Sequence, residues 1–380
     1  MKVYLDNAAT TPMDPQVWEA MLPMMQNHFG NPSSIHSHGR EVRSQIEKAR
    51  KKVAELLNTS PAEIFFTSGG TEADNTILTR CIIDLGVKRI ITSKIEHHAV
   101  LHTAELLSGT KGVELSFVQL DKDGTVDLNH LKSLLQSSDQ KTLVSLMHGN
   151  NEIGNLIDLH EVGTICKEHS ALFHSDTVQT MAHLPIDLEN TPIDFIVGAA
   201  HKFNGPKGVG FMYINHNVKI SPFIHGGAQE RNMRAGTENV YGIIGLAKAL
   251  EIAHEEMTSQ KTHIEGLKKQ MIEQLKANIP DVLFNGKSDS LDESLYTVLS
   301  VSLPPSHMKD MLLFSLDIAG VSASGGSACS SGSNIGSHVL AELDRDQERG
   351  AIRFSFSKFN TPEEINYAVE KLSVILAVPA

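Results

Sequence analysis

Cysteine is scarce in this chain, with 3 among 380 residues. So few cysteines do not make a disulfide framework, and none stands in the C-x-x-C spacing that is typical of metal knuckles. Persistent disulfides belong to oxidising compartments, so this composition fits a reducing one.

Long apolar runs and an excess of basic charge are also lacking. No run approaches the roughly 18 apolar residues that a membrane span needs. The first residues, MKVYLDNAATTP, contain no apolar segment of the kind that export signals carry. A net charge of −12 argues against nucleic acid or an anionic membrane as the main partner. We therefore expect a globular cytoplasmic protein.

The three cysteines have different surroundings. Cys81 lies in NTILTRCIIDLG and Cys166 in EVGTICKEHS, two amphipathic stretches in which a small apolar side chain is expected to face a core. Cys329 lies in SASGGSACSSGSN, residues 322–334, which offers nothing hydrophobic to pack against. An exposed thiol is open to oxidation, so its presence on a polar loop indicates a chemical role.

The order of predicted elements favours an α/β fold. The runs EIFFTS, RIITSKI, TLVSLMH, ALFHSD, DFIVGAA and GVGFMYI are typical of strands, and amphipathic helical stretches lie between most of them. Strands that alternate with helices predict a mainly parallel sheet covered on both faces. We expect this large domain to span residues 15–250.

The C-terminal third has a different pattern. A long helical stretch from IIGLAKALEIAHEEM to IEGLKKQMIEQLKANIP precedes the predicted strands VLFNG, YTVLSVSLP and AIRFSFSKF. Thr361 to Glu364, with Pro362 between them, has the sequence of a capping box at the start of a last helix. We expect residues 1–14 and 251–380 to form a smaller α+β domain that carries the mobile cysteine loop 322–334.

Ligands of open α/β sheets bind outside the carboxyl ends of the strands. After EIFFTS come Gly69, Gly70 and Thr71 at the start of a helix, where backbone N–H groups could hold a phosphate; a simple tight turn is the alternative. After RIITSKI comes His97, whose ring could stack on a planar ligand. His98 and His102 could share a metal on one helix face, although no third ligand is suitably spaced.

Two further predicted strands are followed by charged residues, Asp176 and Lys202. Asp176 follows ALFHSD, with Gln179 three residues later. A buried aspartate needs a cation, and the protonated ring nitrogen of pyridoxal phosphate is one candidate. Lys202 follows DFIVGAA, where burial would depress its pKa and favour a Schiff base. A solvated hairpin lysine is the alternative.

Nine motifs together extend over nearly the whole chain. They occur in the order YLDNAATTP, NPSSIHSHGR, FTSGGTEADN, EHHAV, NNEIG, HSDTVQ, AHKFNGPKGVG, RAGTENV and SGGSACSSGS. In these motifs the chain resembles the cysteine desulfurases, which belong to the aminotransferase class V group of fold-type-I pyridoxal phosphate enzymes. The long cysteine loop resembles the subclass that supplies sulfur for iron–sulfur cluster assembly.

The resemblance implies a role for each matching residue around the cofactor. Lys202 would form the Schiff base, His97 would stack on the pyridine ring and Asp176 would keep the ring nitrogen protonated. Asn151 and Gln179 would bond the ring oxygen. The residues implied for the phosphate are Gly70, Thr71, His201 and, from the second subunit of a homodimer, Thr237.

For the substrate, the resemblance implies that Arg353 binds the carboxylate of L-cysteine and that Asn7 lies near the same place. Cys329 would take the sulfur as a persulfide, leaving L-alanine, and deliver it to acceptor proteins such as an iron–sulfur scaffold or a sulfur carrier. No resident metal is implied, although Cys329 could transiently ligate an iron–sulfur cluster. The enzyme alternatives are a selenocysteine lyase and a class V aminotransferase, and a catalytically idle scaffold is the alternative from another class.

The chain departs from the family pattern at two places. Ala199 stands where a serine usually bonds the phosphate, so one donor is missing. Phe356 and Ser357 stand where Leu-Gly is usual, and we expect them to crowd the substrate end.

Overall fold

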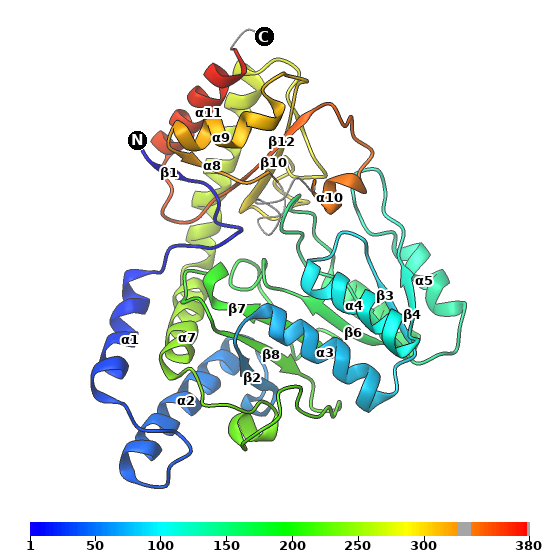
Figure 1. Ribbon diagram of the computed structural model, residues 1–380, viewed down its shortest axis with the longest axis vertical. Coiled ribbons are helices and arrows are strands. Elements are labelled where there is room, and N and C mark those ends of the chain that lie inside the picture. The colour runs from blue at the N-terminus through cyan, green and yellow to red at the C-terminus, as the bar shows by residue number, and fades with distance from the viewer. Residues whose placement is uncertain (326–335, 378–380) are drawn as a thin grey trace.

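The computed structural model describes residues 1–325 and 336–377, so Cys329 and most of the loop 322–334 lie outside the described residues. A seven-stranded sheet in the order β2-β8-β7-β6-β5-β3-β4 forms its centre (Figure 1). Its strands are β2 (Ile64–Thr67), β3 (Arg89–Thr92), β4 (Glu114–Phe117), β5 (Thr142–Ser145), β6 (Leu172–Asp176), β7 (Phe195–Ala199) and β8 (Gly210–Ile214). Only β8 runs antiparallel to its neighbours, which confirms the predicted α/β class with a mainly parallel sheet.

Successive residues of each strand point to opposite faces of the sheet, and both faces are covered. Phe66 belongs to the core shared with one set of helices, whereas its neighbour Phe65 belongs to the core on the other face. The first set comprises α1 (Pro15–Asn27), α2 (Ser37–Leu56), α5 (Leu128–Gln136), α6 (Leu159–Glu168) and α7 (Val240–Glu255). The other face is covered by α3 (Gly70–Leu85) and α4 (His98–Lys111).

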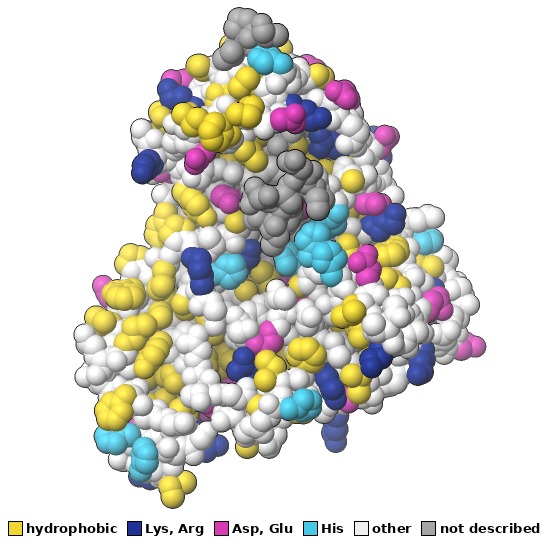
Figure 2. Space-filling view, viewed as in Figure 1, with side chains coloured by type: hydrophobic (Ala, Val, Ile, Leu, Met, Phe, Trp, Pro, Cys, Tyr) yellow, Lys and Arg dark blue, Asp and Glu magenta, His cyan; other side chains and the backbone are white. Residues whose placement is uncertain are grey.

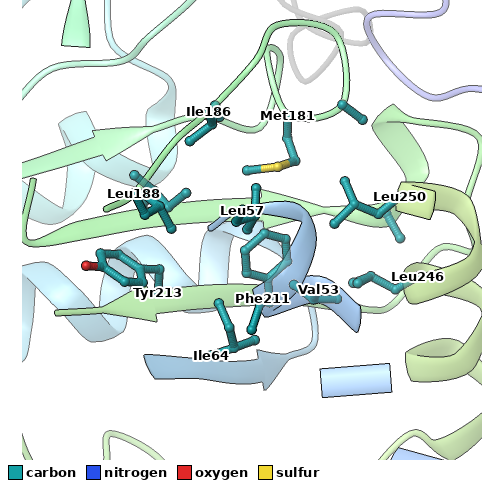
Figure 3. Packing of buried hydrophobic residues seen from close by; sticks show 14 of the residues in the cluster. Val53, Leu57, Ile64, Met181, Ile186, Leu188, Phe211, Tyr213, Leu246 and Leu250 are labelled. Atoms are coloured by element: carbon teal, nitrogen blue, oxygen red, sulfur yellow. The ribbon is translucent and has the colours of Figure 1, made fainter. Parts of the chain in front are cut away.

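The packing of the first face is seen in Figure 3. Phe211 of β8 lies beside Val53 and Leu57 at the end of α2, and Leu246 and Leu250 of α7 lie on the same face of the sheet. All five residues belong to one buried cluster. Cys166 packs in the same cluster and Cys81 in the opposite one, so the prediction that both cysteines face a core is confirmed.

A second, smaller assembly is built from both ends of the chain. Its strands are β1 (Val3–Tyr4), β9 (Leu283–Phe284), β10 (Val298–Leu303), β11 (Val321–Ser322) and β12 (Gly350–Ser355), and its helices are α8 (Met257–Asn278), α9 (Leu312–Ile318) and α11 (Pro362–Leu376). The short helix α10 (His338–Ala341) packs instead with Ile95 and Ile153. β1 pairs with β11, and Asp6 bridges to Ser355 next to it. The first residues are therefore held in the C-terminal assembly, and α11 begins with the predicted capping box.

The helical pattern that links the two assemblies forms two helices, because the chain bends at Glu256 between α7 and α8. Ile252 and Ala253 of α7 still pack in the large core, whereas Ile264 of α8 packs in the small one. We propose that the division between the domains falls at this bend. No helix among the described residues is long and apolar enough to cross a membrane.

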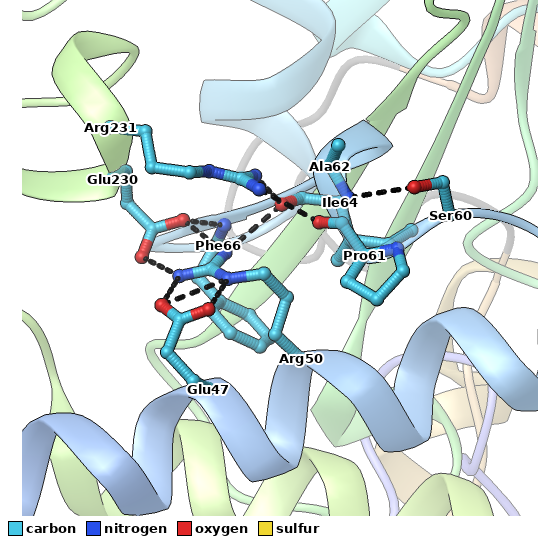
Figure 4. A network of polar contacts seen from close by, with 9 residues as sticks. All are labelled: Glu47, Arg50, Ser60, Pro61, Ala62, Ile64, Phe66, Glu230 and Arg231. Carbon is cyan, nitrogen blue, oxygen red and sulfur yellow. Dashed lines mark hydrogen bonds and ion pairs between the residues drawn. The ribbon is translucent and has the colours of Figure 1, made fainter.

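A buried ion pair fixes one loop against the central sheet (Figure 4). Arg50 of α2 donates from both terminal nitrogens to the carboxylate of Glu230, at 2.7 and 2.8 Å, and the same carboxylate accepts from the backbone N–H of Phe66. Both side chains are almost fully buried, at 2% and 3% exposure. Glu230, Arg231 and Asn232 all have positive φ angles, which side chains other than glycine disfavour. We infer that the ion pair helps to hold this left-handed turn.

Removing Glu230 leaves a buried guanidinium without its counterion. We expect Glu230→Ala to lower the free energy of unfolding by about 3–5 kcal/mol, measured as a shift in the urea unfolding midpoint. Glu47→Ala is the matched control, because Glu47 bonds the same Arg50 from a half-exposed position and an exposed pair contributes about 0–1 kcal/mol. Equal losses in the two variants would contradict the account.

Candidate active site

A cavity of about 260 Å³ lies at the carboxyl edge of the central sheet. It receives residues from the ends of several strands, from the N-terminal segment and from β12 of the small assembly. Its lining comprises Ala8, Ala9, Gly70, Thr71, Asp74, His97, Met147, Asn151, Asp176, Val178, Gln179, Ala199, His201, Lys202 and Arg353. Most of the residues predicted from the sequence are thus brought to one place.

Lys202 stands at the end of a short 3₁₀ turn, Ala200–Lys202, that follows β7 directly. Its Nζ donates hydrogen bonds to the carbonyl oxygens of Ala8 and Ala9, at 2.6 and 3.0 Å. The side chain therefore reaches into the cavity toward the N-terminal segment, and this geometry disfavours the solvated hairpin alternative.

Asp176 is the last residue of β6 and is 5% exposed. Its Oδ1 accepts from the backbone N–H of Val178 at 2.8 Å. Burial raises the pKa of Asp176, while His97 and Lys202 nearby act to lower it. A cation that enters the cavity would stabilise the ionised form of this carboxyl group.

His97 is the N-cap of α4, and its Nδ1 accepts from the backbone N–H of Ala99 at 3.1 Å. The N-cap role fixes the ring at the end of the loop after β3. Burial lowers the pKa of His97, whereas the negative charge of Asp176 acts to raise it. The geometry therefore presents a neutral ring with its proton on Nε2.

The start of α3 forms a concave surface with exposed amides. Its N-cap is Gly69, and no side chain caps the helix, so the N–H groups of the first turn remain open to a ligand. A Cβ on Gly70 would lie 2.7 Å from Val178 Cγ2 and 4.0 Å from Ala199 Cβ. Gly70 thus allows the start of α3 to approach Val178 closely, in the part of the cavity that is also lined by Ala199, the position that lacks the usual serine.

His201 lies beside this surface. Its Nδ1 contacts Thr10 Oγ1 at 3.2 Å, so the threonine hydroxyl can donate to Nδ1 and leave Nε2–H for a ligand. Burial, helped by Lys202 and Lys207, lowers the pKa of His201 to about 4. The ring is neutral at physiological pH and acts as a hydrogen-bond donor rather than as a cation.

Arg353 supplies positive charge at the opposite side, where β12 meets the cavity. It is 2% exposed, donates from Nη1 to the carbonyl of Asn151 and pairs through Nη2 with Asp6, both at 2.8 Å. Within the described part of the chain its Nε has no hydrogen-bond partner. Gln179 donates to the carbonyl of Ala8 at 3.0 Å, which leaves its amide oxygen available.

Two of the predicted residues that the structure describes, Asn7 and Thr237, do not line this cavity. Asn7 lines a small adjoining void beside Lys202, and its amide nitrogen donates to the carbonyl of Ser355 at 2.8 Å. Thr237 lines a separate cavity of about 170 Å³, together with Arg234. Cys329 lies outside the described residues.

Phe356 and Ser357, the second departure from the family pattern, do not line the main cavity either. Phe356 is 1% exposed, packs in the small core and lines the void next to Lys202. It does not line the cavity that contains Arg353, so the expected crowding is not seen there.

Three histidine rings lie against one another next to His97. Figure 2 shows histidine side chains gathered on one part of the surface. The ring of His98 lies 4.4 Å from that of His102 and 4.3 Å from that of His338. Burial and the neighbouring rings lower the pKa of His98 to about 4. Within residues 1–325 and 336–377, no group of three or more metal-ligating side chains is placed to hold a metal ion.

Asp74 is the ionisable residue of the cavity lining that sequence reasoning missed. It lies on α3 at helical spacing from the buried residues Ile77, Leu78 and Cys81, and it is 1% exposed. A charged residue on the apolar face of a helix is a detectable signal, since such a group is almost never fully buried without a reason.

Comparisons with known proteins agree with this geometry. The family description of aminotransferase class V matches residues 3–368. The cysteine desulfurase IscS of Dictyoglomus turgidum is 43% identical over 99% of this chain and 94% of its own length. The putative cysteine desulfurase IscS 1 of Bacillus subtilis is also 43% identical, over 99% of this chain and 98% of its own length.

Solved structures are also similar to this chain over nearly its whole length. A structure described as a NifS-like protein superposes with a TM-score of 0.91 at 40% identity, covering 99% of this chain and 100% of that one. A structure described as SspA in complex with cysteine has a TM-score of 0.80 at 29% identity, covering 95% and 100%. The chain therefore belongs to the aminotransferase class V family and, within it, to the cysteine desulfurases.

Proposed function

We propose that this enzyme is a pyridoxal 5′-phosphate-dependent cysteine desulfurase that converts L-cysteine to L-alanine and leaves the sulfur as a persulfide on Cys329. The observation that carries the proposal is the convergence of Lys202, Asp176 and Arg353 on one cavity. The similarity to a structure described as a complex with cysteine supports L-cysteine as the substrate.

The residues present fit the cofactor. The uncapped start of α3, where Gly70 and Thr71 line the cavity, suits a phosphate group that hydrogen-bonds to backbone amides. Asp176 would face the ring nitrogen, His97 would lie on the ring and Lys202 would hold the aldehyde carbon. When bound, pyridoxal phosphate supplies an electron sink for the bonds at the substrate's Cα.

Lys202 is also placed to move a proton. Its amine is held by the carbonyl oxygens of Ala8 and Ala9, so its position is fixed from the small assembly rather than by solvent. We propose that this amine removes the Cα proton of cysteine and returns a proton later. The lysine then acts as a general base whose orientation depends on the N-terminal segment.

Arg353 would bind the substrate carboxylate. Asp6 and the carbonyl of Asn151 hold its two terminal nitrogens, which fixes the plane of the guanidinium, and its Nε–H faces no acceptor within the described residues. A carboxylate at this place gains a charge-assisted hydrogen bond without requiring Arg353 to move.

Sulfur transfer would use the thiolate of Cys329. It attacks the sulfur of the bound cysteine, a new S–S bond forms and the Cβ–S bond breaks. The electron pair of that bond remains with the substrate, whose Cβ takes a proton and becomes the methyl group of alanine. The enzyme keeps the sulfur as Cys329–S–SH, so atoms and electrons balance without an external oxidant.

We propose further that the enzyme is a cytoplasmic homodimer in which Thr237 reaches the phosphate of the second subunit, and that an iron–sulfur scaffold or a sulfur carrier accepts the persulfide. A selenocysteine lyase or a class V aminotransferase is the alternative. The aminotransferase would not need Cys329 and would require a keto acid.

The test compares two cysteine variants of the holoenzyme. Cys329→Ala should lose alanine formation from L-cysteine by orders of magnitude, because no thiol receives the sulfur, while the absorbance of the bound cofactor is retained. Cys166→Ala is the control, since Cys166 is 1% exposed in the core and should leave the reaction unchanged. Full activity of Cys329→Ala, measured by alanine release with a reductant present, would refute the desulfurase mechanism.

A second test addresses the phosphate end of the cavity. Ala199→Ser should add a hydrogen bond to a charged group, worth about 1.5–3 kcal/mol, and so tighten cofactor binding roughly ten- to a hundredfold. Gly70→Ala should weaken binding, because its Cβ would lie 2.7 Å from Val178 Cγ2 and the start of α3 would have to shift. The measurement is cofactor retention during dialysis. If both variants retain the cofactor as the parent does, the phosphate lies elsewhere.

A further inference from the structure

A buried polar pair stands behind Asp176, outside the set of residues that the proposed reaction uses. Asp74 of α3 is 1% exposed, and its Oδ1 lies 3.3 Å from Nε2 of His174. Within the described residues neither of these two buried atoms makes a hydrogen bond. His174 is 0% exposed, and its Nδ1 lies 2.8 Å from Ser145 Oγ on the neighbouring strand β5. The three polar side chains are all buried and follow one another at these distances.

This pair is positioned toward the site. His174 and Asp176 are two residues apart on β6, so their side chains lie on the same face of the strand. Asp74 itself lines the cavity together with Asp176. Two carboxyl groups therefore share one region of low dielectric.

Two arrangements of protons satisfy the distances. In the first, Ser145 donates to Nδ1, and Nε2–H of His174 donates to an ionised Asp74. In the second, Asp74 is protonated and donates to Nε2, and Nδ1–H donates to Ser145. The first arrangement places a second buried anion in the cavity that Asp176 lines, and two like charges in one buried region are unfavourable.

The surroundings favour the second arrangement. The charged or titratable groups around Asp74 and Asp176 are His174 of β6, Glu96 and His97 before α4, and Lys202 after β7. Within the described residues no lysine or arginine forms an ion pair with Asp74. Burial, and then the carboxyl groups of Asp176 and Glu96, raise the pKa of Asp74, while burial lowers the pKa of His174 to about 3.

We propose that Asp74 is a protonated, neutral acid whose O–H faces Nε2 of His174, and that this positioning pair leaves the negative charge of the region on Asp176, where it would keep the cofactor's ring nitrogen protonated. The inference depends on the proposed function for the identity of that ring. It predicts that the proton of Asp74 would turn toward Asp176 if His174 were not there to accept it.

The first experiment follows the ring nitrogen directly, with ¹⁵N-labelled pyridoxal phosphate in the holoenzyme and NMR over a pH series. Asp74→Asn should behave as the parent, because the amide also donates to Nε2. His174→Leu should lower the pH at which the ring nitrogen loses its proton by about one unit or more, because Asp74 then shares its proton with Asp176. Adding Asp74→Ala to His174→Leu should restore the parent behaviour.

These variants separate an electrostatic role from a packing role. A shift in Asp74→Asn as large as that in His174→Leu would show that Asp74 acts as an anion, which contradicts the inference. A double variant that is not restored would show that His174 acts only through packing, which also contradicts it.

The second experiment needs no variant. In ¹⁵N-histidine-labelled parent enzyme, His174 should carry its proton on Nδ1 and have a bare Nε2, and the opposite tautomer would overturn the inference even if every variant failed to fold. A parent protein that binds no pyridoxal phosphate would instead contradict the proposed function, while the tautomer would still decide the state of the pair.

Discussion

The site depends on a carboxylate that is held out of water. Asp176 ends a buried strand at the carboxyl edge of the sheet, where the backbone offers it one N–H donor, from Val178. Burying an uncompensated charge is expensive, so the site is stable only with positive charge opposite this group. Lys202 lies close enough to act on Asp176, and the protonated ring of the proposed cofactor would add a second positive charge. The neutral state that we infer for Asp74 avoids a second negative charge.

The same constraint explains why both ends of the chain meet at the sheet. The carbonyl oxygens of Ala8 and Ala9 hold the amine of Lys202, and Asp6 pairs with Arg353. These contacts join the N-terminal segment and β12, which belong to the small assembly, to a cavity formed mainly by the large one. A cavity built in this way can fix a small zwitterionic substrate from two sides, with its carboxylate at one end and its reacting carbon at the other.

Much of the fold follows from local pattern, and the exceptions have physical reasons. The apolar runs that end in Thr67, Asp176 and Ala199 are strands, as predicted, because strands buried on both faces need continuous apolar residues. β4 was missed because this edge strand is only partly buried and carries no apolar run. The bend at Glu256 was missed because the apolar spacing continues through it.

The candidate site was predictable where one strand end carries one functional residue, as for His97 and Lys202. The Arg50–Glu230 pair joins residues 180 positions apart, and no local pattern indicates such a contact. The same limit applies to Thr237, which lies in a cavity of its own in one chain and whose proposed role needs a second subunit. Asp74 is a different case, because its place on an apolar helix face marked it as unusual, but only the tertiary structure shows that it faces His174.

The most direct test of the central claim is a single turnover without any reductant. The holoenzyme would be mixed with L-cysteine, quenched and measured for free alanine and for added sulfur on the peptide that contains Cys329. The account predicts equal amounts of alanine and of a persulfide on that peptide, both stopping at the amount of subunit present. Alanine that continues to accumulate with no sulfur on Cys329, or a keto acid in its place, would contradict it.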